Sequence, residues 1–206
     1  MKKIILFAAI VACTTGVFGQ NKTNASGKKE GKWSGYYESN NLRYIGEFKE
    51  GKEVGVFTYY EDVPGQKIKA TRDFSKEAGK SYAVFYLDGK KMSEGWYKGQ
   101  LREGKWVYYH KGGEKINSEE YYVNDKLDGT RKIFYISGSV SDVIPYKNGK
   151  MHGKVLMYSE SGTVLKEENY ANGMRNGESI YYDGNGKLIK KGNFVDDVLQ
   201  GKWIES

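Results

Sequence analysis

The segment YKNGKMHGKVLMY, residues 146–158, holds the pattern that decides the fold of this chain. Tyr146 ends one apolar run, Asn148-Gly149 follows, and Gly153 opens a second apolar run that ends at Tyr158. Asn-Gly between two apolar runs is the strongest short signal for a β-hairpin, because both central residues of the turn need positive φ. Similar segments occur elsewhere in the chain, so one strand-turn-strand unit is repeated.

The glycine that opens each apolar run recurs every 24 or 25 residues. The series is Gly31, Gly55, Gly79, Gly104, Gly129, Gly153, Gly177 and Gly201. Each unit contains two apolar, aromatic-rich segments joined by Gly-rich turns. Helical periodicity is absent outside the apolar N-terminal segment, residues 1–19. We therefore expect an all-β fold, an elongated antiparallel meander or open solenoid of about seven β-hairpin repeats of 24–25 residues. Neighbouring hairpins would bury faces that one hairpin cannot bury alone.

The N-terminus predicts export from a bacterial cell. Lys2 and Lys3 precede an apolar run that is too short and too diluted to span a bilayer, so residues 1–19 are expected to be a cleaved signal peptide. An alternative is a lipobox, in which Cys13 would be lipidated. Residues 20–30 are expected to be a flexible polar leader and residues 31–206 the repeat domain. The protein would then be periplasmic, outer-membrane-associated or secreted, with no transmembrane span in the mature chain.

Composition narrows the class of partner. Cleavage removes the only cysteine and lowers the formal net charge from +7 to +5, because Lys2 and Lys3 are lost. The remaining charge is dispersed, which argues against nucleic-acid binding but allows weak attraction to anionic lipid or polysaccharide. The chain has 18 Tyr and 27 Gly but only 2 Pro. That composition favours many short strands joined by tight turns.

The aromatic residues are the candidate binding groups. Adjacent strand residues point to opposite faces, so one face can carry a continuous aromatic stripe. The stripe is either the core of the solenoid or a partly open surface that binds sugar rings, a peptide or another sheet. The tryptophans that follow an anchor glycine are expected to be exposed platforms: Trp33, Trp106 and Trp203. The recurring tyrosines of the surface are Tyr37, Tyr60, Tyr86, Tyr109, Tyr135, Tyr158 and Tyr182.

The sequence assembles no catalytic site, metal site or cofactor site. His110 and His152 stand at different positions of non-adjacent units, and two histidines without further ligands do not define a zinc site. Carboxylates recur beside lysines, which is typical of a solvated sheet face.

Residues 61–81 depart from the repeat and contain Pro64-Gly65. They are expected to be an insertion at a hairpin tip, with a specificity loop as the alternative.

One unit closely resembles a known repeat. In YIGEFKEGKEVGVFTYYED (residues 44–62), the residues that match the MORN repeat are Tyr44, Gly46, Glu47, Phe48, Gly51, Lys52, Gly55 and Tyr59. The later units resemble the bacterial variant of this repeat, found in proteins labelled YwqK-family antitoxins. The resemblance covers roughly residues 28–206.

The resemblance implies a binding function. MORN-type repeats imply recognition of proteins or lipid head groups and no catalysis by the repeat itself. The antitoxin label implies a cytoplasmic partner, and a signal peptide argues against that. We therefore expect an exported, non-enzymatic scaffold that mediates protein or cell-envelope interaction, and the alternative is a module that binds carbohydrate or lipid head groups. A weaker resemblance links GKWVYYHKGGEK (104–115) to choline-binding cell-wall repeats.

Overall fold

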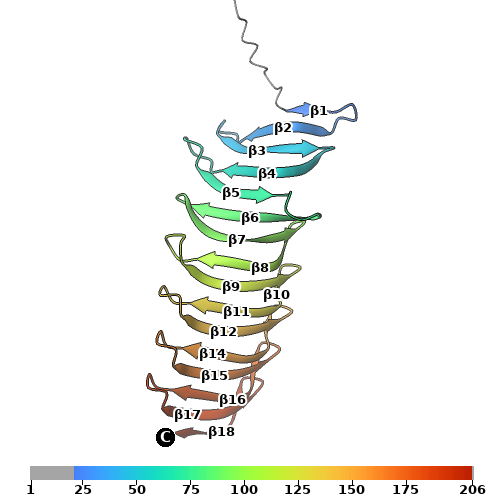
Figure 1. Cartoon of the computed structure of the whole chain (residues 1–206). Coiled ribbons are helices and arrows are strands. Elements are labelled where there is room, and N and C mark those ends of the chain that lie inside the picture. The colour runs from blue at the N-terminus through green and yellow to red at the C-terminus, as the bar shows by residue number, and fades with distance from the viewer. Residues whose placement is uncertain (1–20, 206) are drawn as a thin grey trace, which may run out of the picture.

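The computed structural model describes residues 21–205, which form one open antiparallel sheet (Figure 1). The first strands are β1 (Lys22–Thr23), β2 (Lys29–Tyr36), β3 (Leu42–Lys49), β4 (Lys52–Tyr60), β5 (Ile68–Asp73), β6 (Lys80–Leu87), β7 (Lys90–Lys98), β8 (Leu101–Tyr109) and β9 (Ile116–Val123). The others are β10 (Lys126–Leu127), β11 (Gly129–Phe134), β12 (Val140–Lys147), β13 (Lys150–Met151), β14 (Gly153–Tyr158), β15 (Val164–Ala171), β16 (Met174–Tyr182), β17 (Leu188–Val195) and β18 (Val198–Glu205). The predicted all-β meander of hairpins is confirmed.

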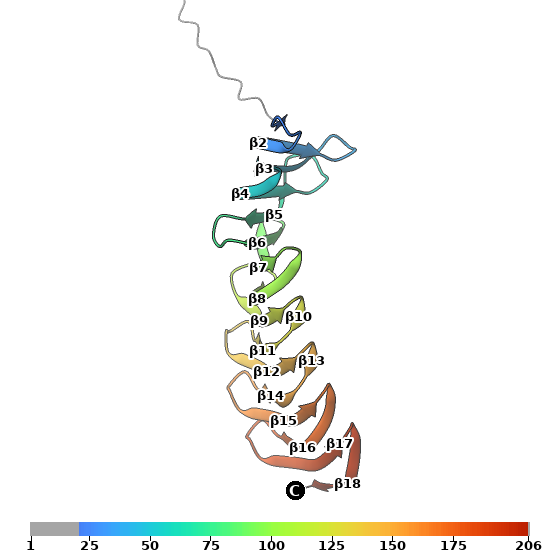
Figure 2. The same ribbon diagram turned by 90° about the vertical axis from the view of Figure 1, so that its right-hand side faces the viewer.

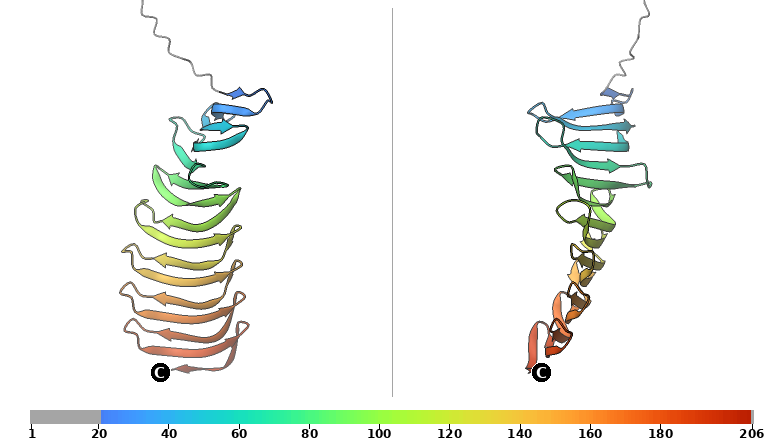
Figure 3. Two further views of the ribbon diagram at one scale, coloured as in Figure 1. Left: turned by 45° about the vertical axis from the view of Figure 1, so that its right-hand side comes forward. Right: turned by 60° about the vertical axis from the view of Figure 1, so that its left-hand side comes forward.

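Each strand pairs with its neighbour along the chain, so the strands stack like rungs along one long axis (Figures 1 and 2). The short strands β10 and β13 lead into β11 and β14 within the same rung, since β9 pairs with both β10 and β11 and β12 pairs with both β13 and β14. The strands are bowed, and the sheet twists between its two ends (Figure 3). A right-handed strand twist that accumulates across many strands produces this shape.

The Asn-Gly joints are tight turns with the predicted backbone. Asn148 has φ 49° and Gly149 has φ 82°, and Asn172 and Gly173 repeat the pattern at 52° and 92°. Two positive φ values match the right-handed twist of the flanking strands. Other joints reach the same conformation without glycine, as at Asp196-Asp197 with φ 46° and 66°.

Five of the joints are also bonded to the unit before them. The Gly149 N–H donates to the Leu127 carbonyl at 2.7 Å, and the Gly173 N–H donates to the Met151 carbonyl at 2.8 Å. The same bond recurs at Gly51, Asp125 and Asp197. The turns are therefore stacked by backbone hydrogen bonds as well as by the sheet ladder.

A β-bulge recurs near the end of the first strand of every unit, and it corrects the expected alignment of the tyrosines. Register shifts occur at Gly35/Tyr36, Tyr59/Tyr60, Phe85/Tyr86, Tyr108/Tyr109, Ile133/Phe134, Met157/Tyr158 and Tyr181/Tyr182. Tyr36 therefore aligns with Tyr60, and Tyr37 lies one residue later. Tyr135 is displaced in the same way. Tyr37 and Tyr135 therefore lie after the ends of β2 and β11, where their N–H groups donate to the Asn41 and Ser139 carbonyls across the turns.

The N-terminal region differs from expectation. Lys22 and Thr23 form β1 and pair with Glu30 and Lys29 of β2, and the Asn21 side chain donates to the Ser34 carbonyl at 3.0 Å. The described part of residues 20–30 is thus the first edge of the sheet instead of a flexible leader. The expected signal peptide and Cys13 lie outside the described residues.

The segment from 61 to 81 holds a long hairpin loop, strand β5 and a second turn. β4 and β5 pair on either side of residues 61–67, which places Pro64 in the loop. Lys67 in this loop forms ion pairs with Glu61 at 3.5 Å and with Asp88 in the next turn at 2.5 Å. The insertion is therefore tied to its neighbouring unit.

Candidate binding face

One face of the sheet, here called the aromatic face, carries clusters of large aromatic rings among residues 33–122 and again near the C-terminal end. Phe57 is 1 % exposed and contacts Phe48 and Phe74 edge-on, with ring centroids 5.1 and 5.6 Å apart. Trp106 is 2 % exposed and meets Tyr97 edge-on at 5.1 Å. Edge-to-face pairs at these distances stabilise the fold beyond the area that they bury.

Glycines on neighbouring strands make room for the largest rings. A Cβ atom built on Gly46 would lie 2.3 Å from the Phe57 ring, and one built on Gly95 would lie 2.4 Å from the Trp106 ring. At the C-terminal end, Trp203 packs over Gly192 in the same way, with a contact of 3.0 Å. A glycine that faces a large aromatic ring therefore recurs at several of the junctions where one unit meets the next.

The three tryptophans differ in exposure, and the expectation for Trp106 is wrong. Its ring is buried because Gly95 lets it lie against the sheet, and its Nε1–H donates to the Trp96 carbonyl at 3.0 Å. Trp33 and Trp203, in the first and last units, are half-buried. Whether these two rings bind a ligand stays a prediction.

The predicted tyrosines Tyr37, Tyr60, Tyr86, Tyr109, Tyr135, Tyr158 and Tyr182 are all half-buried. Two of them bridge units, because Tyr37 Oη donates to the Tyr60 carbonyl at 2.8 Å and Tyr135 Oη donates to the Tyr158 carbonyl at 2.7 Å. These hydroxyls lock one hairpin to the next. Part of the predicted binding set thus has a demonstrable structural role.

Adjacent residues do point to opposite faces. Tyr108 contacts Trp106 on the aromatic face, whereas Tyr109 Oη donates to Glu94 on the second face. Burial, and then the bond to Glu94, raise the pKa of Tyr109. Tyr82 lies edge-on to Trp96 at 5.1 Å on this second face. The second face therefore carries its own aromatic and acidic cluster.

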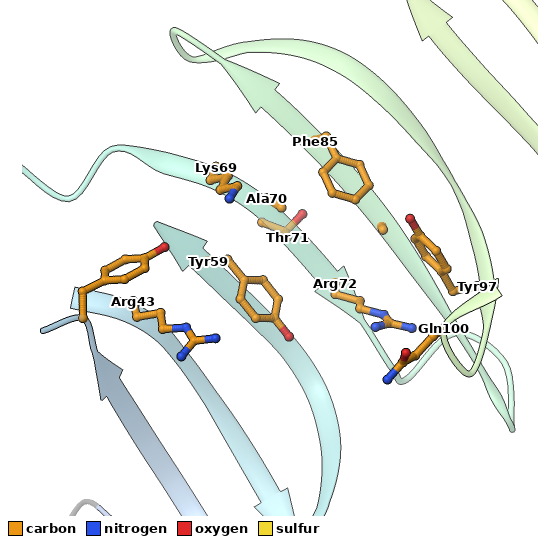
Figure 4. Close-up of a pocket in the computed structure, with 11 residues that line it drawn as sticks. Arg43, Tyr59, Lys69, Ala70, Thr71, Arg72, Phe85, Tyr97 and Gln100 are labelled. Atoms are coloured by element: carbon orange, nitrogen blue, oxygen red, sulfur yellow. The ribbon is translucent and has the colours of Figure 1, made fainter. Parts of the chain in front are cut away.

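A hollow lies between β3 and β7 on the aromatic face, where it separates two clusters of rings (Figure 4). Its volume is about 530 Å³, and its lining residues include Ala70 and Ala83 on adjacent strands. Figure 4 shows Tyr59 on one side and Phe85 and Tyr97 across the space from it, with the Arg72 side chain reaching toward Tyr97 and Gln100. Burial, and then the carboxylate of Glu53, raise the pKa of Tyr59 to about 12, so this hydroxyl stays a hydrogen-bond donor at physiological pH. The hollow combines aromatic walls with polar groups.

Arg72 connects this hollow to a second one. The second hollow has a volume of about 610 Å³ and is lined in part by Lys52, Glu53, Arg72 and Lys80. Arg72 Nε donates to Ser81 Oγ at 2.6 Å, and Nη2 donates to the Gly99 carbonyl. These bonds fix the guanidinium at the border of the two hollows.

Sequence reasoning missed Arg72 and the hollow. Once the strands are aligned by register, Ala83 stands where Trp33, Phe57 and Trp106 stand in three other units, but Arg131, Val155 and Ser179 also occupy this position. A small residue at this position is therefore not by itself a signal for the hollow. The histidines remain without a site: His110 Nε2 lies 3.0 Å from the Phe134 carbonyl, and His152 is exposed in a turn. Within residues 21–205, no cluster of three His, Cys, Asp or Glu residues is placed to hold a metal ion.

Comparison with known protein families finds one family whose model matches parts of this chain. The model of the MORN repeat variant matches residues 29–50, 151–172 and 175–196. No curated protein matches the chain. Across the described part of the chain, no helix has the length and hydropathy needed to cross a bilayer.

Two solved structures share limited similarity with the chain. One is a mutant of S. aureus TarM in complex with fondaparinux, alpha-GlcNAc-glycerol and UDP, at 14 % identity over 59 % of this chain and 19 % of that chain, with a TM-score of 0.23. The other is TarM at 16 % identity, over 57 % of this chain and 20 % of that chain, with a TM-score of 0.22. The chain thus spans about a fifth of the length of these structures.

Proposed function

Because the chain carries repeats of the MORN variant family, we propose that it is an exported, non-enzymatic scaffold that binds a protein or cell-envelope component through its aromatic-rich sheet. The observation that carries the proposal is the open single-layer sheet, whose aromatic face bears clusters of large rings in several units. Such a quasi-one-dimensional stack presents an extended surface to one partner. Repeats of this family are generally non-enzymatic, which supports a binding role.

Crosslinked pull-down from envelope fractions tests the scaffold. The wild-type chain is expected to retain a specific envelope component, and Tyr97→Ala on the aromatic face is expected to lose it. Tyr121→Ala is the control, because Tyr121 is 40 % exposed on the second face. Far-ultraviolet circular dichroism must show that both variants fold. Recovery of nothing above background by the wild type, or equal recovery by both variants, would contradict binding through the aromatic face.

Export rests on the sequence of residues 1–19 and has its own test. The mass of the N-terminal peptide of the mature protein is expected to begin at Gln20 for a free exported chain, or to show a lipidated Cys13 for an anchored one. An intact Met1 on protein from the cytoplasmic fraction would contradict export.

A second candidate is binding of carbohydrate or a lipid head group. It is favoured by the hollow of Figure 4, where aromatic rings and cationic side chains meet. Pockets that fix small ligands combine apolar walls with a few convergent polar groups in this way. Retention of the wild-type chain on glycan resin or on anionic liposomes is the first measurement. Absence of retention on both supports would contradict this candidate.

A further inference from the structure

The hollow lies at a junction that lacks the glycine-and-ring pair found at three other junctions. At three junctions the second strand of one unit supplies glycine and the next strand supplies a large ring. These pairs are Gly46 with Phe57, Gly95 with Trp106 and Gly192 with Trp203. At the junction of β5 and β6 the pair is Arg72 with Ala83. The ring is missing, and an arginine stands in place of the glycine.

The guanidinium of Arg72 is held in place by bonds that use only some of its N–H donors. Its guanidinium lies 4.8 Å from the Tyr97 ring centroid and 5.2 Å from the Phe74 centroid. The bonds to Ser81 and Gly99 use two of the five N–H donors of an arginine. A planar guanidinium with free donors matches a carboxylate or sulfate in a bidentate arrangement. The side chain is therefore preorganised for an anion.

The charge of the hollow is not neutralised from within the protein. Arg43, Lys69 and Arg72 line it, and its lining contains no carboxylate. Among residues 21–205, none of these three cations takes part in an ion pair. The nearby Glu53 lines the second hollow and accepts a bond from Tyr59 Oη at 3.3 Å.

Other charged junctions of the aromatic face are neutralised. Glu120 pairs with Arg131 across the junction at 2.9 Å, and Glu168 pairs with Lys166 at 3.2 Å. The hollow beside Arg72 thus differs from these junctions, because its cationic side chains form no ion pair with a carboxylate. Charge complementarity assigns an anionic ligand to this hollow.

We propose that the hollow binds an acidic saccharide, with Arg72 as the residue that holds its carboxylate or sulfate group. The inference rests on the proposed binding role and names the ligand class. Tyr59, Phe85 and Tyr97 offer rings for the apolar faces of sugars, and Gln100 offers an amide for hydroxyl groups. The second hollow continues beyond Arg72 and adds Lys52, whereas its Lys80 is already paired with Glu77 at 2.8 Å. The two hollows together leave room for a chain of acidic units instead of one compact head group.

Binding assays with defined probes test the proposal. The mature chain is titrated with oligogalacturonate, dextran sulfate, neutral dextran, and vesicles containing phosphatidylglycerol. We expect binding to one or both acidic saccharides and none to neutral dextran, with the first two probes separating carboxylate from sulfate. Binding to neutral dextran with equal affinity, to vesicles alone, or to no probe would overturn the proposal.

Matched variants locate the site. Arg72→Gln and Lys187→Gln each remove one positive charge. Lys187 is the control because it lies exposed in the turn between β16 and β17, far along the chain from the hollow. Loss of a charge-assisted bidentate contact should weaken binding about 10- to 100-fold in Arg72→Gln. The Lys187→Gln variant should stay within about twofold of the wild type, because screened surface charge contributes little. Equal weakening by both variants would overturn the assignment to the hollow.

A double variant separates binding from folding. Arg72→Gly with Ala83→Phe recreates the glycine-and-ring junction that Gly46 and Phe57 form, so it is expected to fold and to fill the hollow. Its urea midpoint should match or exceed that of the wild type, while acidic saccharide binding is lost. Retained binding in this folded variant would refute the site. Envelope pull-down by the same variant distinguishes the two proposals, because a scaffold with another ligand would still recover its partner.

Discussion

Gly95→Ala tests the central feature of the fold, which is the close approach of a large ring to a neighbouring strand. The new Cβ would lie 2.4 Å from Cδ2 of Trp106, whereas carbon atoms in contact normally lie about 3.5–4.0 Å apart. The ring must therefore move by about 1 Å. Its Nε1–H bond to the Trp96 carbonyl at 3.0 Å and its contact with Tyr97 oppose that movement.

The expected cost follows from two opposing effects. Overpacking of a well-filled core destabilises by about 1–3 kcal/mol, and the restrained ring places Gly95→Ala near the upper end. Alanine regains about 0.5–1 kcal/mol relative to glycine inside a strand, because the unfolded chain loses less entropy. The free energy of unfolding should fall by about 2 kcal/mol. Urea titration followed by far-ultraviolet circular dichroism measures the change.

The control and the refuting result come from the same chain. A Cβ on Gly184 would meet no atom within 4 Å, so Gly184→Ala should change the free energy of unfolding by less than about 0.5 kcal/mol. In a Trp106→Ala background the penalty of Gly95→Ala should vanish, because the opposing ring is gone. Equal effects of Gly95→Ala and Gly184→Ala, or a penalty that persists without the ring, would refute the reasoning.

Three further predictions concern pH and the turns. Burial is the main cause that raises the pKa values of Tyr59, Tyr170 and Tyr181 to about 12, so the stability that they contribute is complete below pH 10 and is lost as pH rises through 12. Tyrosinate absorbance recorded with circular dichroism should show that some of the tyrosines ionise only as the chain unfolds; complete tyrosine ionisation in a folded chain would contradict this. Burial alone would raise the pKa of Glu168, but bonds from Tyr181 and Lys166 lower it below 4.5, so Glu168→Gln should be less stable than the wild type at neutral pH. The difference in urea midpoint should shrink as pH falls below 4.5, and a constant difference would count against the ion pair. Gly149→Ala, at φ 82°, should cost about 1–2 kcal/mol in urea titration, and an unchanged midpoint would show that the turn relaxes freely.

The sequence predicts the fold well because the repeat and the turn chemistry are local. Asn148-Gly149 requires positive φ whatever surrounds it, and the 24–25-residue period fixes how many such turns occur. Opposite facing of adjacent residues, as for Tyr108 and Tyr109, also follows from strand geometry alone. These features need no knowledge of which strands are neighbours in register.

The candidate site depends on register and was therefore harder to predict. Trp106 is buried because Gly95 stands opposite, and a single sequence does not show that pairing. Tyr37 is displaced by one residue because the bulge places Tyr36 opposite the ladder and leaves Tyr37 in the turn. The hollow arises from Arg72 opposite Ala83, two residues that carry no motif. Even once the strands are aligned, Ser179 occupies the same position as Ala83 in another unit, so the site is marked only by the combination of Arg72 and Ala83.

The ladder hydrogen bonds run along the long axis of the sheet, because the strands lie across it (Figure 1). A force applied between the two ends would load these bonds one strand pair at a time, as in a zipper, instead of shearing many together. At five turns a backbone bond to the preceding unit, such as Gly149 to Leu127 at 2.7 Å, adds one more link to be broken at that step. The sheet should therefore lengthen under tension by release of successive hairpins, each at similar low force.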